Sequence, residues 1–126
     1  MQQIFVYGTL KRGFCNESYL KNTTFIDRAI TVDKYPMILK YQAFPHLINV
    51  KGKGHHIKGE VYDIDDEVLL SLDLLEGYPE HYDRDYIDVK LANGDIKKVI
   101  VYFCNDCKDY KKYEMISEFK NWLDED

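Results

Sequence analysis

The dipeptide Asn93-Gly94 lies between two runs of strand-forming residues, and it constrains the fold more than any other feature of the sequence. In the first run, residues 85–91, apolar side chains occupy alternate positions, as in a strand with one buried face. The second run covers residues 96–103. Asn-Gly between two such runs is the strongest short-range signal for a β-hairpin. The sequence therefore predicts two adjacent antiparallel strands in the last part of the chain.

Further extended segments are predicted over residues 4–7, 25–32, 37–39, 44–50 and 57–62. Within the second of these, alternation predicts that one side of the strand carries Ile26, Ile30 and Val32, with Arg28 as an exception. Most of the connections are short enough for hairpins, which favours an antiparallel arrangement.

Two helices are predicted in addition. Acidic residues at 63–67 precede apolar residues at helical spacing, and Gly77 and Pro79 follow as typical stop signals. The second predicted helix lies near the end of the chain and carries Met115, Ile116, Phe119, Trp122 and Leu123. About six strands with two helices predict an α+β fold, with a sheet or small barrel and helices to one side. Spacing alone leaves open whether the sheet closes.

Composition narrows the class of protein. The chain has 126 residues, which suits a single domain over 1–126. A formal net charge of −5 argues against nucleic acid as a partner, because phosphate binding needs a basic surface. No apolar run approaches the roughly 20 residues that span a bilayer, and no signal peptide is recognisable. Three cysteines, an odd number, suit a reducing compartment, so a cytoplasmic protein without membrane contact is expected.

The strand predicted at residues 4–7 opens into a loop at Gly8. Glycine reaches backbone angles closed to other residues and allows close approach to the main chain. Successive N–H groups in such a loop, here those of Gly8, Thr9 and Leu10, can form a concavity that binds an anion. A core strand followed by an ordinary turn is the simpler interpretation of the same pattern.

Glu76 is placed against the local rules for a helix. The last turn of a helix is its negative end, where basic residues are favoured. Departures from local rules tend to fall at functional sites, and burial beside Leu72, Leu75 and Tyr78 would raise the pKa of this carboxyl. A carboxyl with a raised pKa suits a general base near neutral pH. The alternative is an exposed side chain at a frayed helix end.

Other residue clusters carry weaker signals. Cys104 and Cys107 have the spacing of half a zinc site or a redox pair, but there is no second pair, so no metal site is predicted. The histidines, including His46, are interpreted as surface or packing residues. Tyr82 and Arg84 could lie near Glu76, or Arg84 could merely pair with neighbouring acids.

Two separated stretches together resemble the γ-glutamylcyclotransferase superfamily, and more closely its γ-glutamylamine cyclotransferase and AIG2-like branch. They are Val6-Tyr7-Gly8-Thr9-Leu10-Lys11-Arg12-Gly13 and Leu75-Glu76-Gly77-Tyr78-Pro79, followed by Tyr82-x-Arg84. The segments Tyr35-Pro36, Phe44-Pro45-His46-Leu47 and Lys58-Gly59-Glu60-Val61-Tyr62 resemble the same branch, in the same order.

The resemblance implies a small mixed β-barrel or curled sheet flanked by helices. It also implies that a γ-glutamyl amide cyclises to 5-oxoproline and releases a free amine, without metal or organic cofactor. Carried over, Tyr7, Gly8, Thr9 and Leu10 bind the γ-glutamyl group together with Tyr82, and Glu76 is the general acid/base. This requires Glu76 and the Gly8–Leu10 backbone to face one cavity.

Three alternatives remain at this stage. The substrate could be a γ-glutamyl amino acid or glutathione, because the leaving-group pocket decides this. The chain could instead be a non-catalytic binding or sensor module. It could also be an interaction domain with zinc or redox chemistry at Cys104 and Cys107. The oligomeric state is not predicted.

Overall fold

The computed structural model describes residues 1–14, 16–40 and 44–120. In this part of the chain the elements follow one another as β1 (Gln2–Val6), η1 (Glu17–Leu20), β2 (Thr24–Tyr35), β3 (Met37–Lys40), β4 (Phe44–Leu47), β5 (His55–Ile64), α1 (Asp66–Glu76), β6 (Tyr82–Leu91), β7 (Ile96–Cys104) and η2 (Tyr110–Lys112). The two η elements are short 3-10 helices. The first of them falls in the polar segment after the N-terminal loop.

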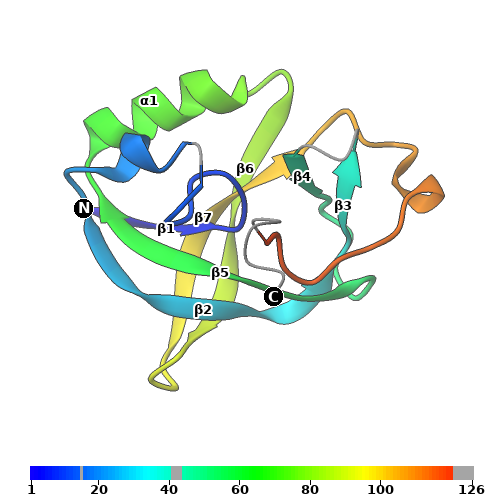
Figure 1. Cartoon of the computed structure of the whole chain (residues 1–126), viewed down its shortest axis with the longest axis horizontal. Coiled ribbons are helices and arrows are strands. Elements are labelled where there is room, and N and C mark those ends of the chain that lie inside the picture. The colour runs from blue at the N-terminus through cyan, green and yellow to red at the C-terminus, as the bar shows by residue number, and fades with distance from the viewer. Residues whose placement is uncertain (15, 41–43, 121–126) are drawn as a thin grey trace.

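Five strands form a closed barrel in the order β1-β5-β2-β6-β7 (Figure 1). The barrel is mixed, because β1 runs parallel to β7, with Ile4 opposite Ile100, while the other pairs are antiparallel. The hairpin predicted at Asn93-Gly94 joins β6 to β7, and Gly94 has a φ of 97°. The predicted α+β fold is therefore confirmed, and the sheet closes.

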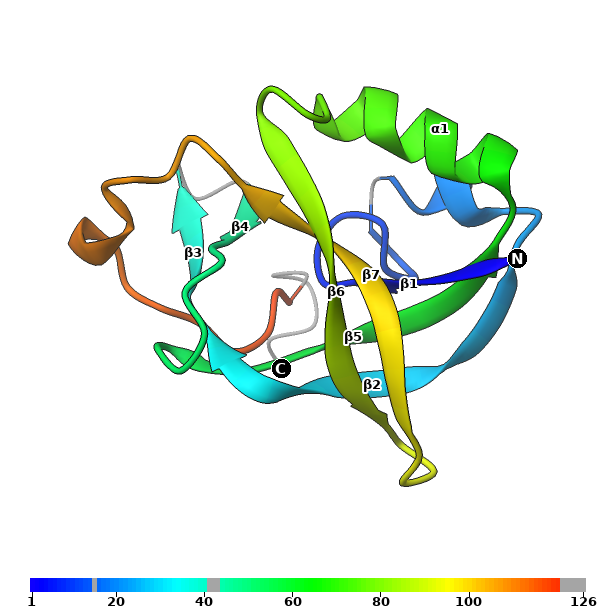
Figure 2. The ribbon, with the colours of Figure 1, turned by 180° about the vertical axis from the view of Figure 1, so that it is seen from behind.

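The barrel strands bury side chains on both of their faces. In β7, Val99, Val101 and Phe103 point into the barrel core, while Ile100 and Tyr102 belong to a second cluster on its outer face. Helix α1 and the segment containing η1 cover that outer face, as both views show (Figures 1 and 2). This double burial explains why the sequence of β7 is a continuous apolar run instead of an alternating one.

Helix α1 begins and ends where the sequence predicts. The Asp65 carboxylate accepts a hydrogen bond of 2.8 Å from the Val68 backbone N–H, which caps the first turn. Gly77 ends the helix in the left-handed conformation, with a φ of 71°. Across the described residues, every helix is too short or too polar to pass through a bilayer.

A two-stranded sheet of β3 and β4 lies beside the barrel, near the end of β7 (Figure 2). The segment that follows β7 passes over this sheet, and Cys107 packs there with Ile38 and Ile48 in a third apolar cluster. This small sheet supplies a surface facing the barrel that a barrel of five strands alone would lack.

The predicted buried side of β2 is wrong for most of its length. The residues of β2 that are buried are Ala29, Thr31 and Tyr35, while Val32 is exposed. The pairing of β2 with β5 shifts register between Phe25 and Asp27. An extra residue in a strand turns the following side chains to the opposite face, so alternation counted from Ile26 fails beyond the bulge.

The helix predicted near the end of the chain is also wrong in the part that the structure describes. Met115 forms an antiparallel bridge with Ile38, the Ile116 N–H donates to Met37 O at 2.8 Å, and Ser117 O accepts from the Lys58 N–H at 2.9 Å. The backbone groups of this segment are thus bonded to β3 and β5 instead of to a helical turn. Trp122 and Leu123, assigned to the same helix, lie outside the described residues.

Candidate active site

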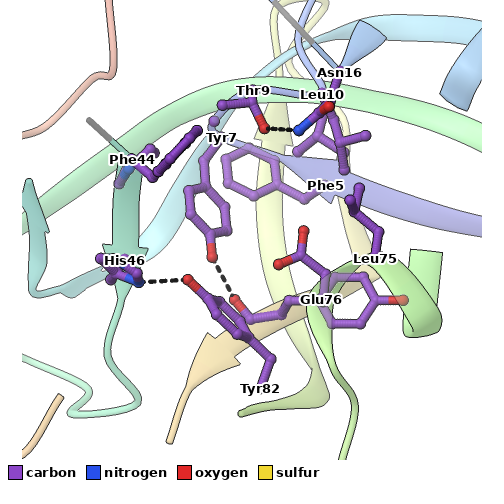
Figure 3. Close-up of a pocket in the computed structure, with 14 residues that line it drawn as sticks. Phe5, Tyr7, Thr9, Leu10, Asn16, Phe44, His46, Leu75, Glu76 and Tyr82 are labelled. Atoms are coloured by element: carbon purple, nitrogen blue, oxygen red, sulfur yellow. Dashed lines mark hydrogen bonds between the residues drawn. The ribbon is translucent and has the colours of Figure 1, made fainter. Parts of the chain in front are cut away.

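A cavity of about 220 Å³ opens where the N-terminal loop, the end of α1, β4 and β6 meet. Its lining residues are Phe5, Val6, Tyr7, Gly8, Thr9, Leu10, Asn16, Phe44, Pro45, His46, Leu75, Glu76, Tyr82 and Tyr102. Figure 3 shows their arrangement. All six residues that the sequence nominates are among them. A larger groove of about 580 Å³ lies along β2, β5 and β6, but exposed Lys and Arg and half-buried Glu side chains line much of it.

Glu76 is the last residue of α1, and its carboxylate is turned into the cavity, toward Phe5 and Tyr7 (Figure 3). Burial raises its pKa from 4.5 to about 7. The last turn of α1 carries no basic residue to oppose this shift. The expected geometry, with Glu76 and the Gly8–Leu10 backbone on one cavity, is confirmed, although the two stretches are more than sixty residues apart.

The N-terminal loop folds back over the mouth of the barrel. The Lys11 N–H donates to Gly8 O at 3.1 Å, and Asn16 donates to Thr9 twice, from its backbone N–H to the carbonyl and from Nδ2 to Oγ1, at 2.9 Å each. The backbone N–H groups of Gly8, Thr9 and Leu10 have no hydrogen-bond partner within the described part of the chain. Three consecutive donors at the cavity wall are therefore available to a ligand.

Of the two reasons predicted for Gly8, the structure supports a close approach to the main chain, here by Pro45 of the same chain, and not the unusual backbone angles. Gly8 is absent from the described glycines with positive φ, so its backbone conformation is open to other residues. A Cβ at this position would instead lie 2.8 Å from Pro45 Cγ. Glycine is required here because the loop passes so close to β4 that no side chain fits between them.

Tyrosine side chains form much of the remaining wall. The Tyr7 hydroxyl donates to Tyr102 O at 2.7 Å, and burial raises the pKa of Tyr7 well above its usual value. The Tyr82 hydroxyl lies 2.6 Å from His46 Nδ1 (Figure 3), and burial, with the nearby Glu76 charge, also raises the pKa of Tyr82. Both phenols therefore remain protonated and can donate hydrogen bonds at neutral pH.

Arg84, in contrast, does not reach the cavity. Its Nε lies 3.2 Å from Asp73 Oδ1, and its guanidinium lies over the Tyr78 ring at 4.6 Å from the ring centre. Asp73 also accepts a hydrogen bond of 2.7 Å from the Tyr102 hydroxyl. Of the two interpretations given for Arg84, the structure supports pairing with a neighbouring acid.

Sequence reasoning missed His46 as a wall residue of the cavity. It lines the cavity from β4, and one of its ring nitrogens also lies within 4.8 Å of the Cys104 and Cys107 sulfurs, which lie within the same distance of each other. The segment Phe44-Pro45-His46-Leu47 was part of the family resemblance, and that was the available signal. Nothing local to β4 indicates that it faces a site more than thirty residues away in sequence.

Comparison with known proteins agrees with this architecture. The family profile described as "Gamma-glutamyl cyclotransferase, AIG2-like" matches residues 4–124. Gamma-glutamylaminecyclotransferase A of Danio rerio is 43% identical over 107 residues, which cover 79% of this chain and 66% of that protein. Gamma-glutamylaminecyclotransferase of Rattus norvegicus is 38% identical over 115 residues, covering 81% of this chain and 77% of that protein.

The crystal structure of an AIG2-like protein from Mus musculus superposes with a TM-score of 0.89 at 30% sequence identity. The alignment covers 95% of this chain and 88% of the mouse chain. The profile match extends over the barrel, α1 and the cavity alike. The chain belongs to the AIG2-like γ-glutamyl cyclotransferase family.

Proposed function

We propose that this protein cyclises a γ-glutamylamine, giving 5-oxoproline and a free amine. The observation that carries the proposal is one cavity lined by a half-buried carboxyl with a pKa of about 7 and by a loop with three consecutive backbone N–H groups that have no partner in the described residues. Membership of the cyclotransferase family supports the reaction class. The names of the zebrafish and rat relatives support an amine as the leaving group.

In this mechanism the loop binds the γ-glutamyl end of the substrate. The N–H groups of Gly8, Thr9 and Leu10 hold either the α-carboxylate or the oxyanion that develops on the γ-carbonyl oxygen. The Tyr82 hydroxyl, fixed by His46, gives a further hydrogen bond to the substrate. These contacts hold the substrate in a folded conformation, with its α-nitrogen next to its γ-carbonyl carbon.

Glu76 then moves a proton. As the carboxylate it takes a proton from the α-ammonium, and the resulting amine attacks the γ-carbonyl carbon. The new C–N bond closes the five-membered ring, and the bond from the γ-carbon to the leaving nitrogen breaks. Of the two protons that the α-nitrogen loses, Glu76 carries the first to the leaving nitrogen. The second also ends on the released amine, which departs as an ammonium ion.

The test is release of 5-oxoproline by the pure protein from a matched panel of substrates. The panel contains a γ-glutamyl alkylamide, a γ-glutamyl amino acid and glutathione, with the α-glutamyl isomer of the alkylamide as a control that cannot cyclise in this way. Turnover of the alkylamide with the highest kcat/KM is expected.

Preference for either of the other γ-glutamyl compounds would keep the reaction and change the leaving group. Binding of all three compounds, measured by thermal shift, without any 5-oxoproline would overturn the enzyme and favour a sensor.

A further inference from the structure

A second group of chemically active side chains lies behind the cavity wall, where β4 meets the end of β7. Cys104 is the last residue of β7, Cys107 follows in the next loop, and His46 comes from β4. Their ligand atoms, two sulfurs and one ring nitrogen, all lie within 4.8 Å of one another. The proposed cyclisation uses neither sulfur.

The loop that follows Cys104 and carries Cys107 is held by its own contacts. The Asn105 N–H donates to His81 O at 2.9 Å, and its side-chain Nδ2 donates to Pro79 O at 3.0 Å. Asp106 lies 3.0 Å from His81 Nδ1. Because these bonds tie the loop to the turn after α1, the two sulfurs are brought together by the fold itself.

This donor set selects a narrow class of metal ions. Thiolates favour Zn²⁺, Cu⁺ and iron–sulfur clusters, and an imidazole suits zinc and copper. In a tetrahedral zinc site the bond lengths of about 2.0–2.3 Å place donor atoms roughly 3.5–4 Å apart. The donor atoms of the present cluster, all within 4.8 Å of one another, would have to move about 1 Å closer to reach that size. The surrounding side chains, which include Ile38, Ile48 and Met115, are apolar and limit access of water.

The hydrogen bond of His46 to the active-site wall fits the same site. Histidines that bind a metal through one ring nitrogen commonly use the other in a hydrogen bond. His46 Nδ1 is already 2.6 Å from the Tyr82 hydroxyl oxygen. If the metal takes Nε2, Nδ1 keeps its proton and donates a hydrogen bond to the Tyr82 oxygen. The hydroxyl hydrogen of Tyr82 is then directed elsewhere, toward the cavity.

We infer that His46, Cys104 and Cys107 bind one zinc ion, with the fourth position left for water. Both thiols lose their protons as the metal binds. The ion joins the sheet of β3 and β4 to the barrel, because it binds His46 of β4 and Cys104 of β7. It also determines which ring nitrogen of His46 carries a proton beside Tyr82. This reverses the expectation from spacing, which lacked a second Cys pair, because the third ligand comes from a distant strand.

The experiment measures zinc binding directly. Untagged, fully reduced protein is dialysed against Zn²⁺, and bound metal is determined by elemental analysis, with affinity measured by chelator competition. Co²⁺ in place of zinc reports thiolate ligation through its charge-transfer absorption. Cys104→Ser and Cys107→Ser each remove one ligand. Cys15→Ser and His55→Gln are controls that remove a thiol and an imidazole outside the set.

One zinc per chain is expected for the parent and for both controls. Each ligand variant is expected to lose more affinity than the roughly 10- to 100-fold that loss of an outer hydrogen-bond partner of a ligand costs, with the cobalt–thiolate band weakened. Circular dichroism checks folding. Cys107 is 4% exposed, so if Cys107→Ser unfolds, the half-buried Cys104 carries the test.

Three results would overturn the inference. The first is a reduced parent without zinc. The second is an equal loss of zinc in Cys15→Ser. The third is a parent in which Cys104 and Cys107 form a disulfide that zinc does not prevent.

Discussion

The cavity has two walls that are built in different ways. The barrel wall consists of the loop Tyr7–Leu10, the end of α1 with Glu76, and Tyr82 at the start of β6. The hairpin wall consists of Phe44, Pro45 and His46 of β4. A closed ladder of strands and a capped helix position the barrel wall. The hairpin wall belongs to a separate sheet of two strands and meets the barrel wall through side chains, such as His46 against Tyr82.

Because the two walls are supported differently, we expect them to have different functions. On the proposed mechanism, the barrel wall holds the γ-glutamyl group, which every substrate shares, and the proton-transfer group. We expect the hairpin wall to face the leaving group, which differs between substrates, because the barrel wall already supplies the groups that bind the shared part. Changes in the barrel wall should therefore affect all substrates alike, and changes in the hairpin wall should alter the preference among them.

The largest effect is expected from Glu76→Gln. Glutamine is nearly isosteric, but it cannot take a proton from the α-ammonium, and loss of a general base costs about 100- to 10,000-fold in rate. The reduction in kcat should be similar for every γ-glutamyl compound that the parent turns over, because the proton transfer is common to them. Steady-state 5-oxoproline release measures it, with Glu80→Gln, an exposed carboxylate nearby, as control. A rate close to that of the parent would remove Glu76 from the mechanism.

The same substitution should change stability in a pH-dependent way. The folded protein keeps a proton on Glu76 up to pH about 7, whereas the unfolded chain releases it near 4.5. The parent therefore loses stability as the pH rises through this window. Glu76→Gln has no such loss and should melt roughly 5 to 10 °C higher than the parent at pH 8. The difference in melting temperature between variant and parent should become smaller toward pH 4.5. A difference that does not change with pH would contradict the raised pKa of Glu76.

Gly8→Ala tests the contact between the two walls. The new Cβ would lie 2.8 Å from Pro45 Cγ, well inside the usual carbon–carbon contact distance of about 3.5–4.0 Å. Overpacking of this kind costs about 1–3 kcal/mol of folding free energy, and it should raise KM for every substrate. Denaturant unfolding and kinetics measure both effects. Adding Pro45→Ala removes the clashing atoms and should restore part of the lost folding free energy. If stability is not restored, the strain does not come from the contact with Pro45.

The smallest effect is expected from Phe44→Ala, and it concerns preference instead of rate. Phe44 lines the cavity from the hairpin wall, and 53% of its surface is exposed. Its removal should change the ratio of kcat/KM between an alkylamide and a γ-glutamyl amino acid by about 10-fold or less. Glu76→Gln is the comparison, because it should leave that ratio unchanged. An equal loss of kcat/KM for both substrates would show that Phe44 does not affect the preference between leaving groups.

The sequence predicts the barrel wall better than the hairpin wall, for a physical reason. The ends of α1 are set by Asp65 and Gly77, and the β6–β7 turn by Asn93-Gly94. These are local interactions, so a local pattern reveals them. The pairing of Glu76 with the N-terminal loop is not local, and only the family resemblance connected them.

The errors arise where tertiary contacts override a local pattern. The bulge after Phe25 moves the buried positions of β2 to the opposite alternation, and no residue type signals it. The apolar spacing at Met115, Ile116 and Phe119 looks helical, yet Met115 packs in one cluster while Ile116 and Phe119 pack against the barrel core. An extended segment that contacts two different clusters can give the same spacing as one helical face.

The strand order of the barrel has a consequence for biosynthesis. β1 and the loop after it leave the ribosome before β5 and β7, the two strands that flank β1, and β7 ends only at Cys104. Such long-range pairing makes folding slow, and until it is complete β1 exposes an apolar, unpaired edge. The N-terminal loop therefore gains a fixed shape only when β7 is in place. A nascent chain stalled before β7 would be inactive and also prone to aggregate, so catalytic competence and protection from aggregation arrive in the same step.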